Sequence, residues 1–163
     1  MFTGAIAASY YGTPRTTIDV DIVVKVSEKN VQPLLLEPLR KAGMQVDERR
    51  IKAALKSGYN IVTVKDKRTT LTVDVIFSDK KLRKKPGTIA GLPTFYQTPE
   101  ELVLSKLRMI KVTTPRERAI KDKDDIRAIM KHTKVKVKTI EKQAQKESTL
   151  AIFKELTRER ENS

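Results

Sequence analysis

Two carboxylates, Asp19 and Asp21, lie two positions apart in an apolar stretch, Thr17–Val26. The stretch alternates as a strand does, with Ile18, Val20, Ile22 and Val24 on one face and Asp19, Asp21 and Val23 on the other. Neighbouring like charges repel, and they are costly to bury unless a cation lies between them. Parallel carboxylates suit one or two divalent ions. The alternative is an edge strand with a solvated acidic face.

A third carboxylate, Asp74, lies in a second apolar run, Thr70–Phe77. This run follows Tyr59–Val64 after a polar turn, and the two together predict a β-hairpin. Alternation puts Leu71, Val73, Val75 and Phe77 on one face and Thr72, Asp74 and Ile76 on the other. Asp74 therefore either joins the metal ligands or pairs with a lysine across the sheet.

The segment before the acidic strand has features of a phosphate site. Gly4 begins a run of small residues that predicts a short helix, with Gly12 ending it in a left-handed conformation. A glycine at a helix start lets a phosphate approach the backbone N–H groups closely. Arg15 lies just before the acidic strand, where it could balance the carboxylates or contact a phosphate.

The order of these features, Gly4-Ala5, a short helix and then Gly-x-Pro-Arg-x-Thr-x-Asp-x-Asp, resembles the signature of polymerase-beta-type nucleotidyltransferases. It is similar in particular to the small prokaryotic branch that includes the AbiE-type toxins. The resemblance implies that Gly4, Ala5, Arg15 and Thr17 contact the nucleotide triphosphate. Many members carry Gly-Ser where this chain has Gly4-Ala5, so one hydroxyl donor to phosphate is missing here.

The same resemblance implies that Asp19 and Asp21 bind Mg²⁺ or Mn²⁺. It assigns Asp74 as the third catalytic aspartate, on a neighbouring antiparallel strand. In that role Asp74 would complete the metal ligands and act as general base toward an attacking hydroxyl.

Two further helices are predicted after Gln97. Thr98-Pro99-Glu100-Glu101 indicates a helix start with Thr98 as N-cap, in a capping box with Glu101. The second helix is expected from near Pro115 to His132, with an inner face of Ile126, Ile129 and Met130.

Three residues on these helices match a second feature of the AbiE-type branch, a lysine on one helix and Asp-x-x-Asp on the next. They are Lys106, Asp122 and Asp125. The resemblance implies that they flank the nucleotide, with Lys106 on a phosphate. The alternative is a salt-bridged pair of helices in which Lys106 or Lys121 contacts both aspartates.

Positive charge is concentrated in one part of the chain. The net charge is +14, and between Arg49 and Lys85 twelve Lys or Arg face three Asp. This indicates a polyanionic partner, with RNA first; the alternative is a solvated basic surface. We expect Lys80, Lys81, Arg83, Lys84 and Lys85 to contact a polynucleotide backbone. No aromatic residue interrupts that run, so base stacking is not predicted there.

Composition narrows the chemistry and the setting. There is no cysteine and only one histidine, which excludes disulfides and a cysteine nucleophile and argues against zinc centres and Ser-His-Asp triads. No apolar run is long enough to cross a membrane, so a soluble, cytoplasmic protein without a membrane partner is expected. The 33% share of charged residues is typical of thermophile proteins.

The expected fold is α/β (α+β), a small mixed sheet with flanking helices as a core domain over residues 1–97 and a helical region over 98–163. A helix through Val31 to Lys41 would end at Gly43 and dock through Leu34, Leu35 and Leu39. A short helix, Glu48 to Lys56, is capped by Asp47 and ends at Gly58. Pro86-Gly87 should break the chain before one or two short strands, and a last helix is expected from Thr139 to about Arg158.

Only three residues precede Gly4, where the resembling family has a helix and a strand. We expect a sheet edge beside the acidic strand that lacks its partner, and a true start upstream of Met1. A homodimer or a cognate partner protein could cover such an edge.

The predicted function is metal-dependent transfer of a nucleoside monophosphate from an NTP to a hydroxyl acceptor, with RNA, tRNA-like, as the expected acceptor. The alternative is a catalytically degenerate module of the same fold that binds RNA or a partner protein.

Overall fold

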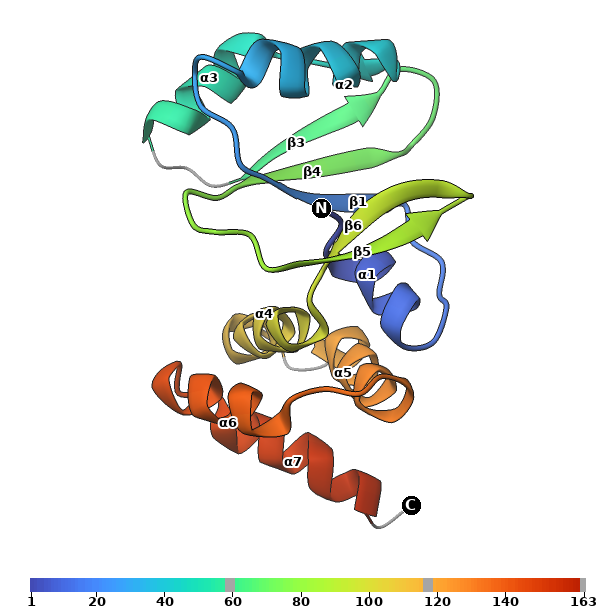
Figure 1. Ribbon diagram of the computed structural model, residues 1–163, viewed down its shortest axis with the longest axis vertical. Coiled ribbons are helices and arrows are strands. Elements are labelled where there is room, and N and C mark those ends of the chain that lie inside the picture. The colour runs from blue at the N-terminus through green and yellow to red at the C-terminus, as the bar shows by residue number, and fades with distance from the viewer. Residues whose placement is uncertain (58–60, 116–118, 162–163) are drawn as a thin grey trace. The chain divides into compact units, whose positions relative to one another are not determined.

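The computed structural model describes residues 1–57, 61–115 and 119–161, with side chains described up to residue 158. The chain forms two compact units, Met1–Ile6 with Thr16–Tyr96 (unit 1) and Ala7–Arg15 with Gln97–Ser163 (unit 2). It is α+β, as the sequence predicts, with strands in unit 1 and a helical unit 2 (Figure 1). The short predicted helix is α1 (Gly4–Tyr11), which begins in unit 1 and ends in unit 2.

The main sheet of unit 1 is mixed, in the order β1-β4-β3-β2. Its strands are β1 (Asp19–Val24), β2 (Met44–Gln45), β3 (Ile61–Asp66) and β4 (Thr72–Phe77). The hairpin β3–β4 is antiparallel, as predicted, whereas β1 and β4 are parallel. The expectation of an antiparallel strand for Asp74 is therefore wrong. After β1 the chain crosses over the sheet through a helical segment, residues 32–41, and enters it again at β2; since β2–β3 and β3–β4 are both antiparallel, β4 runs in the direction of β1.

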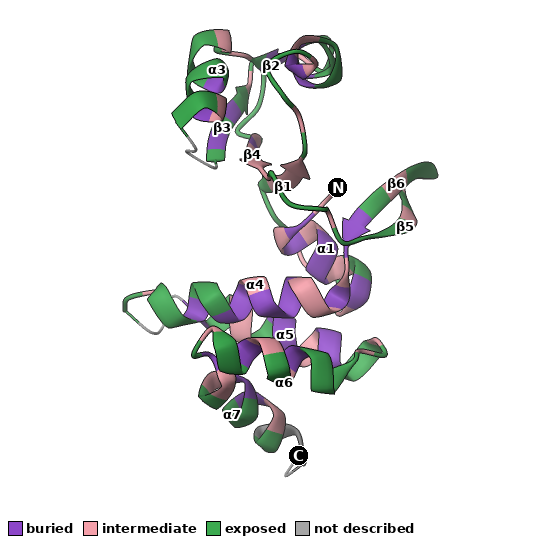
Figure 2. Ribbon diagram, turned by 60° about the vertical axis from the view of Figure 1, so that its left-hand side comes forward, coloured by how far each residue is buried: buried purple, intermediate pink, exposed green. Residues whose placement is uncertain are grey.

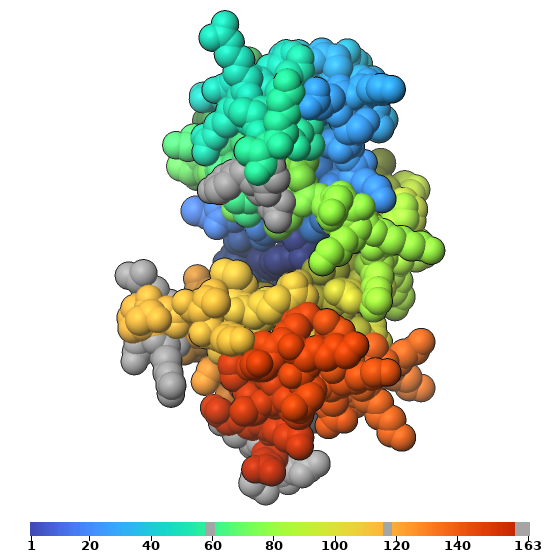
Figure 3. Space-filling view, turned by 90° about the vertical axis from the view of Figure 1, so that its left-hand side faces the viewer, coloured from blue at the N-terminus to red at the C-terminus, as the bar shows by residue number. Residues whose placement is uncertain are grey.

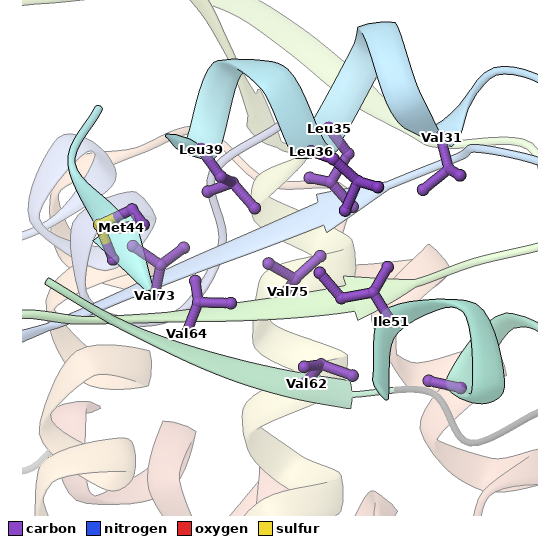
Figure 4. Packing of buried hydrophobic residues seen from close by; sticks show 11 residues of the cluster. Val31, Leu35, Leu36, Leu39, Met44, Ile51, Val62, Val64, Val73 and Val75 are labelled. Carbon is purple, nitrogen blue, oxygen red and sulfur yellow. The ribbon is translucent and has the colours of Figure 1, made fainter. Parts of the chain in front are cut away.

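Three helical segments cover one face of this sheet (Figure 1). They are η1, a π-helical segment (Gln32–Leu36), α2 (Glu37–Lys41) and α3 (Glu48–Ser57). The core between them and the sheet consists of Val31, Leu35, Leu36, Leu39, Met44, Ile51, Ala54, Val62, Val64, Val73 and Val75 (Figure 4). Asp47 caps α3 as predicted, accepting a hydrogen bond from the Arg50 N–H at 3.0 Å. Gly58, the predicted end of this helix, lies outside the described residues.

The helix predicted from Val31 to Lys41 is present, but its inner face differs by one residue from the prediction. Leu34 is 60% exposed, while Leu36 is fully buried. The π-helical geometry of η1 explains the shift, since it places more residues in a turn than an α-helix does. Pro38 lies in the first turn of α2, where its missing N–H is tolerated. Gly43 follows with φ of +82°, the left-handed conformation expected after a helix.

The outer edge of β1 is paired, contrary to the prediction. Phe2 is the antiparallel partner of Ile22 and the parallel partner of Tyr96. The Thr3 N–H donates to the Asp21 carbonyl at 3.0 Å, and the Phe2 N–H donates to the carbonyl of Phe95 at 2.8 Å. Residues 1–3 therefore join the main sheet to a second, two-stranded sheet.

This second sheet is a hairpin of β5 (Lys84–Ile89) and β6 (Leu92–Gln97). Pro86 and Gly87 lie inside β5, so the predicted break is wrong. A strand with only one neighbour tolerates proline, because the missing N–H can face away from that neighbour. Ala90 and Gly91 form the turn with φ of +47° and +79°.

Unit 2 contains α4 (Pro99–Val112), α5 (Ile120–His132), α6 (Val137–Lys146) and α7 (Leu150–Glu161). Buried residues follow the sides of these helices that face one another (Figure 2). Ile126, Ile129 and Met130 are buried, as expected. Helix α4 begins where predicted, although the Thr98 side chain makes no cap hydrogen bond. In the described part of the chain, no helix combines the length and the apolar character needed to span a membrane.

Two expectations about chain turns in unit 2 are wrong. The last predicted helix is two helices, because Ser148 adopts φ of +57° between α6 and α7. Gly12 does not have the left-handed conformation. It is instead required for packing, since a Cβ at Gly12 would lie 2.9 Å from the Cβ of Ala128.

The shifted inner face of η1 yields a direct comparison between two neighbouring leucines. We expect Leu35→Ala to lower the free energy of unfolding by about 2–5 kcal/mol, because it leaves a cavity in the core. Leu34→Ala removes the same atoms from an exposed position and should change it by less than about 0.5 kcal/mol. Urea unfolding of both variants measures the difference; equal losses would contradict the described inner face.

Candidate functional site

Three carboxylates share the face of the main sheet that is turned away from the core. In the parallel ladder Asp21 is the direct partner of Asp74, and Asp19 is the partner of Thr72. Neighbouring strands are about 4.8 Å apart, so paired side chains project side by side. Val73 and Val75, which flank Asp74 in sequence, point into the core instead. The strand pattern that buries the valines thus places Asp19, Asp21 and Asp74 on one face of the sheet, the acidic face.

Two threonine hydroxyls hold the outer carboxylates. The Thr72 hydroxyl donates to Asp19 Oδ1 at 2.6 Å, and the Thr63 hydroxyl donates to Asp74 Oδ1 at 2.5 Å. Thr63 is the cross-strand partner of Asp74 in the β3–β4 hairpin. Sequence reasoning did not single out either threonine. The hairpin register could have identified Thr63, because it places polar β3 residues opposite polar β4 residues, whereas Thr72 requires the parallel register of β1 with β4.

Gly4 approaches the central carboxylate closely. A Cβ at this position would lie 1.8 Å from Asp21 Oδ2, and φ of +56° also favours glycine. The close approach that the sequence assigned to a phosphate is made here by Asp21. The next residue, Ala5, is buried. The Thr17 hydroxyl contacts the backbone of Asp19, accepting from its N–H and donating to its carbonyl at 3.2 Å each.

The acidic face, formed by Asp19, Asp21 and Asp74, offers donor atoms that can be compared with those that Mg²⁺ or Mn²⁺ requires. Carboxylate oxygens on two adjacent strands are the hard ligands these ions prefer, so the residue types fit. Among the described residues, however, no three carboxylates or imidazoles are gathered closely enough to form a metal site. The outer carboxylates, Asp19 and Asp74, are turned onto different threonines. Asp19, Asp21 and Asp74 therefore suit a divalent ion by residue type and by the face that they share, but their side chains are not grouped as a metal site.

A second polar cluster lies within unit 2. Arg15 binds Asp125 through two hydrogen bonds, Nε to Oδ1 and Nη2 to Oδ2, both 2.9 Å long. Lys106 Nζ lies 2.7 Å from Asp125 Oδ2 and 2.9 Å from Asp122 Oδ1. Lys106 and Asp125 are each only 5% exposed. We call these four residues the ion cluster; its formal charges cancel.

All four residues of the ion cluster are predicted site residues. Lys106 on α4 contacts both Asp122 and Asp125 on α5, which is the salt-bridged helix pair considered as the alternative. Arg15, expected near the strand carboxylates or a phosphate, holds Asp125 instead. The cluster therefore fastens the segment after α1 to both helices.

The pKa of Asp125 reflects this environment. Burial alone raises the pKa of this carboxyl, but hydrogen bonds and positive charge from Arg15 and Lys106 outweigh the burial. The net result is a pKa below the ordinary value for an aspartate. Ionised Asp125 therefore stabilises the fold.

The five basic residues of the predicted polynucleotide-binding run are all exposed. Lys84 and Lys85 lie in β5, and the other three lie between β4 and β5. Side chains of the segment around residues 80–87, coloured light green, project from the surface in Figure 3. Lys84 Nζ lies 3.8 Å from the centroid of the Phe95 ring on β6. Sequence reasoning missed this contact, because eleven positions separate the two residues.

Comparison with protein-family models and with curated proteins finds no match to this chain. The interpretation of the site therefore depends on its geometry and on the sequence motif.

The ion cluster predicts a large difference between adjacent aspartates of α5. Asp125→Ala should lower the free energy of unfolding by about 3–5 kcal/mol, because it removes the partner shared by Arg15 and the buried Lys106. Asp124→Ala removes an exposed carboxylate that contacts Arg127 and should cost about 0–1 kcal/mol. Denaturant unfolding compares the two; similar costs would show that the cluster does not stabilise unit 2.

The lowered pKa of Asp125 predicts a loss of stability in acid. Its contribution is complete above the unfolded-state pKa and disappears as the pH falls through the lower, folded-state pKa. Asp125→Asn should therefore flatten the decline in unfolding free energy as the pH falls below about 4, the usual pKa of an aspartate. Asp124→Asn should keep the wild-type slope. Parallel curves for Asp125→Asn and the wild type would be the contrary result.

Proposed function

We propose that the protein is a metal-dependent nucleotidyltransferase, which transfers a nucleoside monophosphate from an NTP to a hydroxyl acceptor, with RNA as the expected acceptor. The observation that carries the proposal is the shared polar face of Asp19, Asp21 and Asp74 on two adjacent strands. Three like charges on one face of an apolar sheet do not stabilise the fold, since they repel one another. A divalent cation would remove that repulsion.

The sequence motif supports the same proposal independently. Gly4 begins α1 directly beside Asp21, so the glycine and the acidic pair of the motif are neighbours in space. The exposed basic run that follows β4 supplies a charge suited to a polynucleotide acceptor.

Each residue of the acidic face has a proposed role. Asp19 and Asp21 would hold Mg²⁺, and Asp74 would share one ion and accept the proton of the attacking hydroxyl. When bound, Mg²⁺ neutralises phosphate charge and stabilises the attacking and leaving oxygens. The acceptor oxygen bonds to the α-phosphorus while pyrophosphate leaves. Thr63 and Thr72 position two of the carboxylates through their hydroxyls.

The resemblance also places Lys106, Asp122 and Asp125 beside the nucleotide. Their side chains contact one another, and Asp125 also contacts Arg15. A structural role in unit 2 is therefore their better supported function, and the nucleotide-flanking role stays a prediction.

A second candidate is a degenerate module that retains the fold and binds RNA without transfer. Two observations favour it: the carboxylates are not gathered as a metal site among the described residues, and Ala5 replaces the serine of many transferases. This candidate and the transferase differ in activity but share the basic run.

Nucleotide transfer tests the proposal directly. The protein is incubated with each α-labelled NTP, Mg²⁺ and total tRNA, and label in RNA is counted. We expect Asp74→Ala and the double variant Asp19→Ala/Asp21→Ala to lower the rate by more than about 100-fold. Loss of even an indirect partner of a metal ligand costs about 10- to 100-fold. Thr63→Val should therefore lower the rate by about 10- to 100-fold.

The matched control is Asp79→Ala, which removes an exposed carboxylate just beyond β4. It should transfer label at the wild-type rate. Transfer that persists in Asp74→Ala would contradict the assigned roles. No transfer by the wild type with any NTP would favour the binding module.

A further inference from the structure

The β5–β6 hairpin combines positive charge with an exposed aromatic ring. Residues 80–97 contain five Lys or Arg and no Asp or Glu. Phe95 on β6 is 43% exposed, and Lys84 Nζ lies over its ring at 3.8 Å. The adjacent Tyr96 is buried, because successive strand residues point to opposite sides. The structure thus places an aromatic ring beside the basic run, which the linear sequence does not show.

The hairpin is held firmly in unit 1. The hydroxyl of Tyr96 on β6 donates to the carbonyl of Thr88 on β5 at 2.8 Å. The Phe95 carbonyl accepts from the Phe2 N–H, and the Phe2 and Tyr96 rings have centroids 6.0 Å apart. A ring anchored in this way loses little conformational freedom when a ligand stacks on it.

Pairing of residues 1–3 places Phe95 on the same side as the acidic face. Phe2, Ile22 and Tyr96 are bridge partners, so their side chains share one side of the ladder. Phe95 therefore lies on the opposite side, which along β1 is the side of Asp21. Two strand spacings, about 10 Å, separate the backbones of β6 and β1.

We propose that the β5–β6 hairpin binds single-stranded nucleic acid, with one base stacked on Phe95 and the backbone held by Lys80, Lys81 and Lys84. Charge complementarity selects a polyanion, and the exposed ring selects one with accessible flat bases. Bases of a duplex are already stacked, so a duplex cannot use the ring. The inference deepens the proposed transferase, since the bound strand is its acceptor, but the binding itself requires no catalysis.

Lys84 has two alternative positions in this proposal. Without nucleic acid, its ammonium group lies over the Phe95 ring as a cation–π pair. Stacking of a base on an aromatic ring is stronger than such a pair at an exposed site, so a base replaces the ammonium there. The displaced ammonium is then beside the backbone of the same strand and contacts a phosphate.

Binding is measured by fluorescence anisotropy with the full chain, in the absence of NTP and divalent ions. The probes are a labelled 12-nucleotide oligouridylate, the matching single-stranded DNA, an abasic strand of the same length and a duplex. We expect Phe95→Leu to weaken oligouridylate binding by about 5- to 100-fold, because it removes the flat ring. It should leave binding of the abasic strand and the salt dependence unchanged.

Three variants serve as controls. Phe95→Trp should retain or strengthen oligouridylate binding, since it keeps a ring for stacking. Leu92→Ala, at the 67% exposed position next to the turn, should bind as the wild type does. Lys80→Gln/Lys81→Gln/Lys84→Gln should weaken binding of every probe and reduce the slope of log K against log salt by about 2.

Several outcomes would overturn the proposal: wild-type protein that does not bind oligouridylate, Phe95→Leu that binds it normally, or an equal loss for the abasic strand. Tighter binding of duplex than of single strands would do the same. Comparison of the RNA and DNA probes identifies which strand is preferred. Normal binding by Asp19→Ala/Asp21→Ala, together with absent label transfer by the wild type, would reject the transferase and leave the binding site standing.

Discussion

The parallel pairing of β1 with β4 is the constraint on which the rest of unit 1 depends. Its register sets Asp21 opposite Asp74 on one face and Val20 opposite Val73 on the other. A slip of one residue would put carboxylates into the core and valines into solvent. Burial of the valines under η1, α2 and α3 therefore also fixes the acidic face. The stability of the core and the geometry of the candidate site have one physical cause.

The stability of unit 2 depends on a balance between the cost of burying a carboxylate and its contacts with positive charges. Asp125 is buried at a cost that Arg15 and Lys106 offset through short, charge-assisted contacts. These contacts connect a residue at position 15 with helices that begin more than eighty residues later. A polar cluster of this kind specifies one arrangement of helices, since other arrangements would leave a buried charge without its partner.

Sequence alone predicts the parts of this structure that local patterns determine. Alternation correctly identifies the faces of β1 and β4, and Asp47 and Gly43 mark helix ends as expected. Prediction from the sequence fails where the backbone conformation departs from the standard period of a helix or strand. The π-helical turn exposes Leu34, and Ser148 ends α6 without a glycine or proline to indicate it. Strand direction at β4 depends on a crossover, which alternation cannot reveal.

The candidate site was only partly predictable for the same reason. Three aspartates in two strand-like runs are visible in the sequence, but their threonine partners require the registers of the β3–β4 and β1–β4 ladders. The contacts of Arg15 with Asp125 and of Lys84 with Phe95 depend on the tertiary fold.

Residues 1–3 link the main sheet to the hairpin through single bridges, which leaves β5 as the outer strand on the hairpin side. This outer strand is a poor template for another chain, because it carries Pro86 and two lysines. Proline and like charge are among the devices by which β-proteins resist edge-to-edge aggregation. The hairpin is therefore protected on its open edge against self-assembly into extended sheets, and a partner bound there would contact it through side chains instead of by adding a strand.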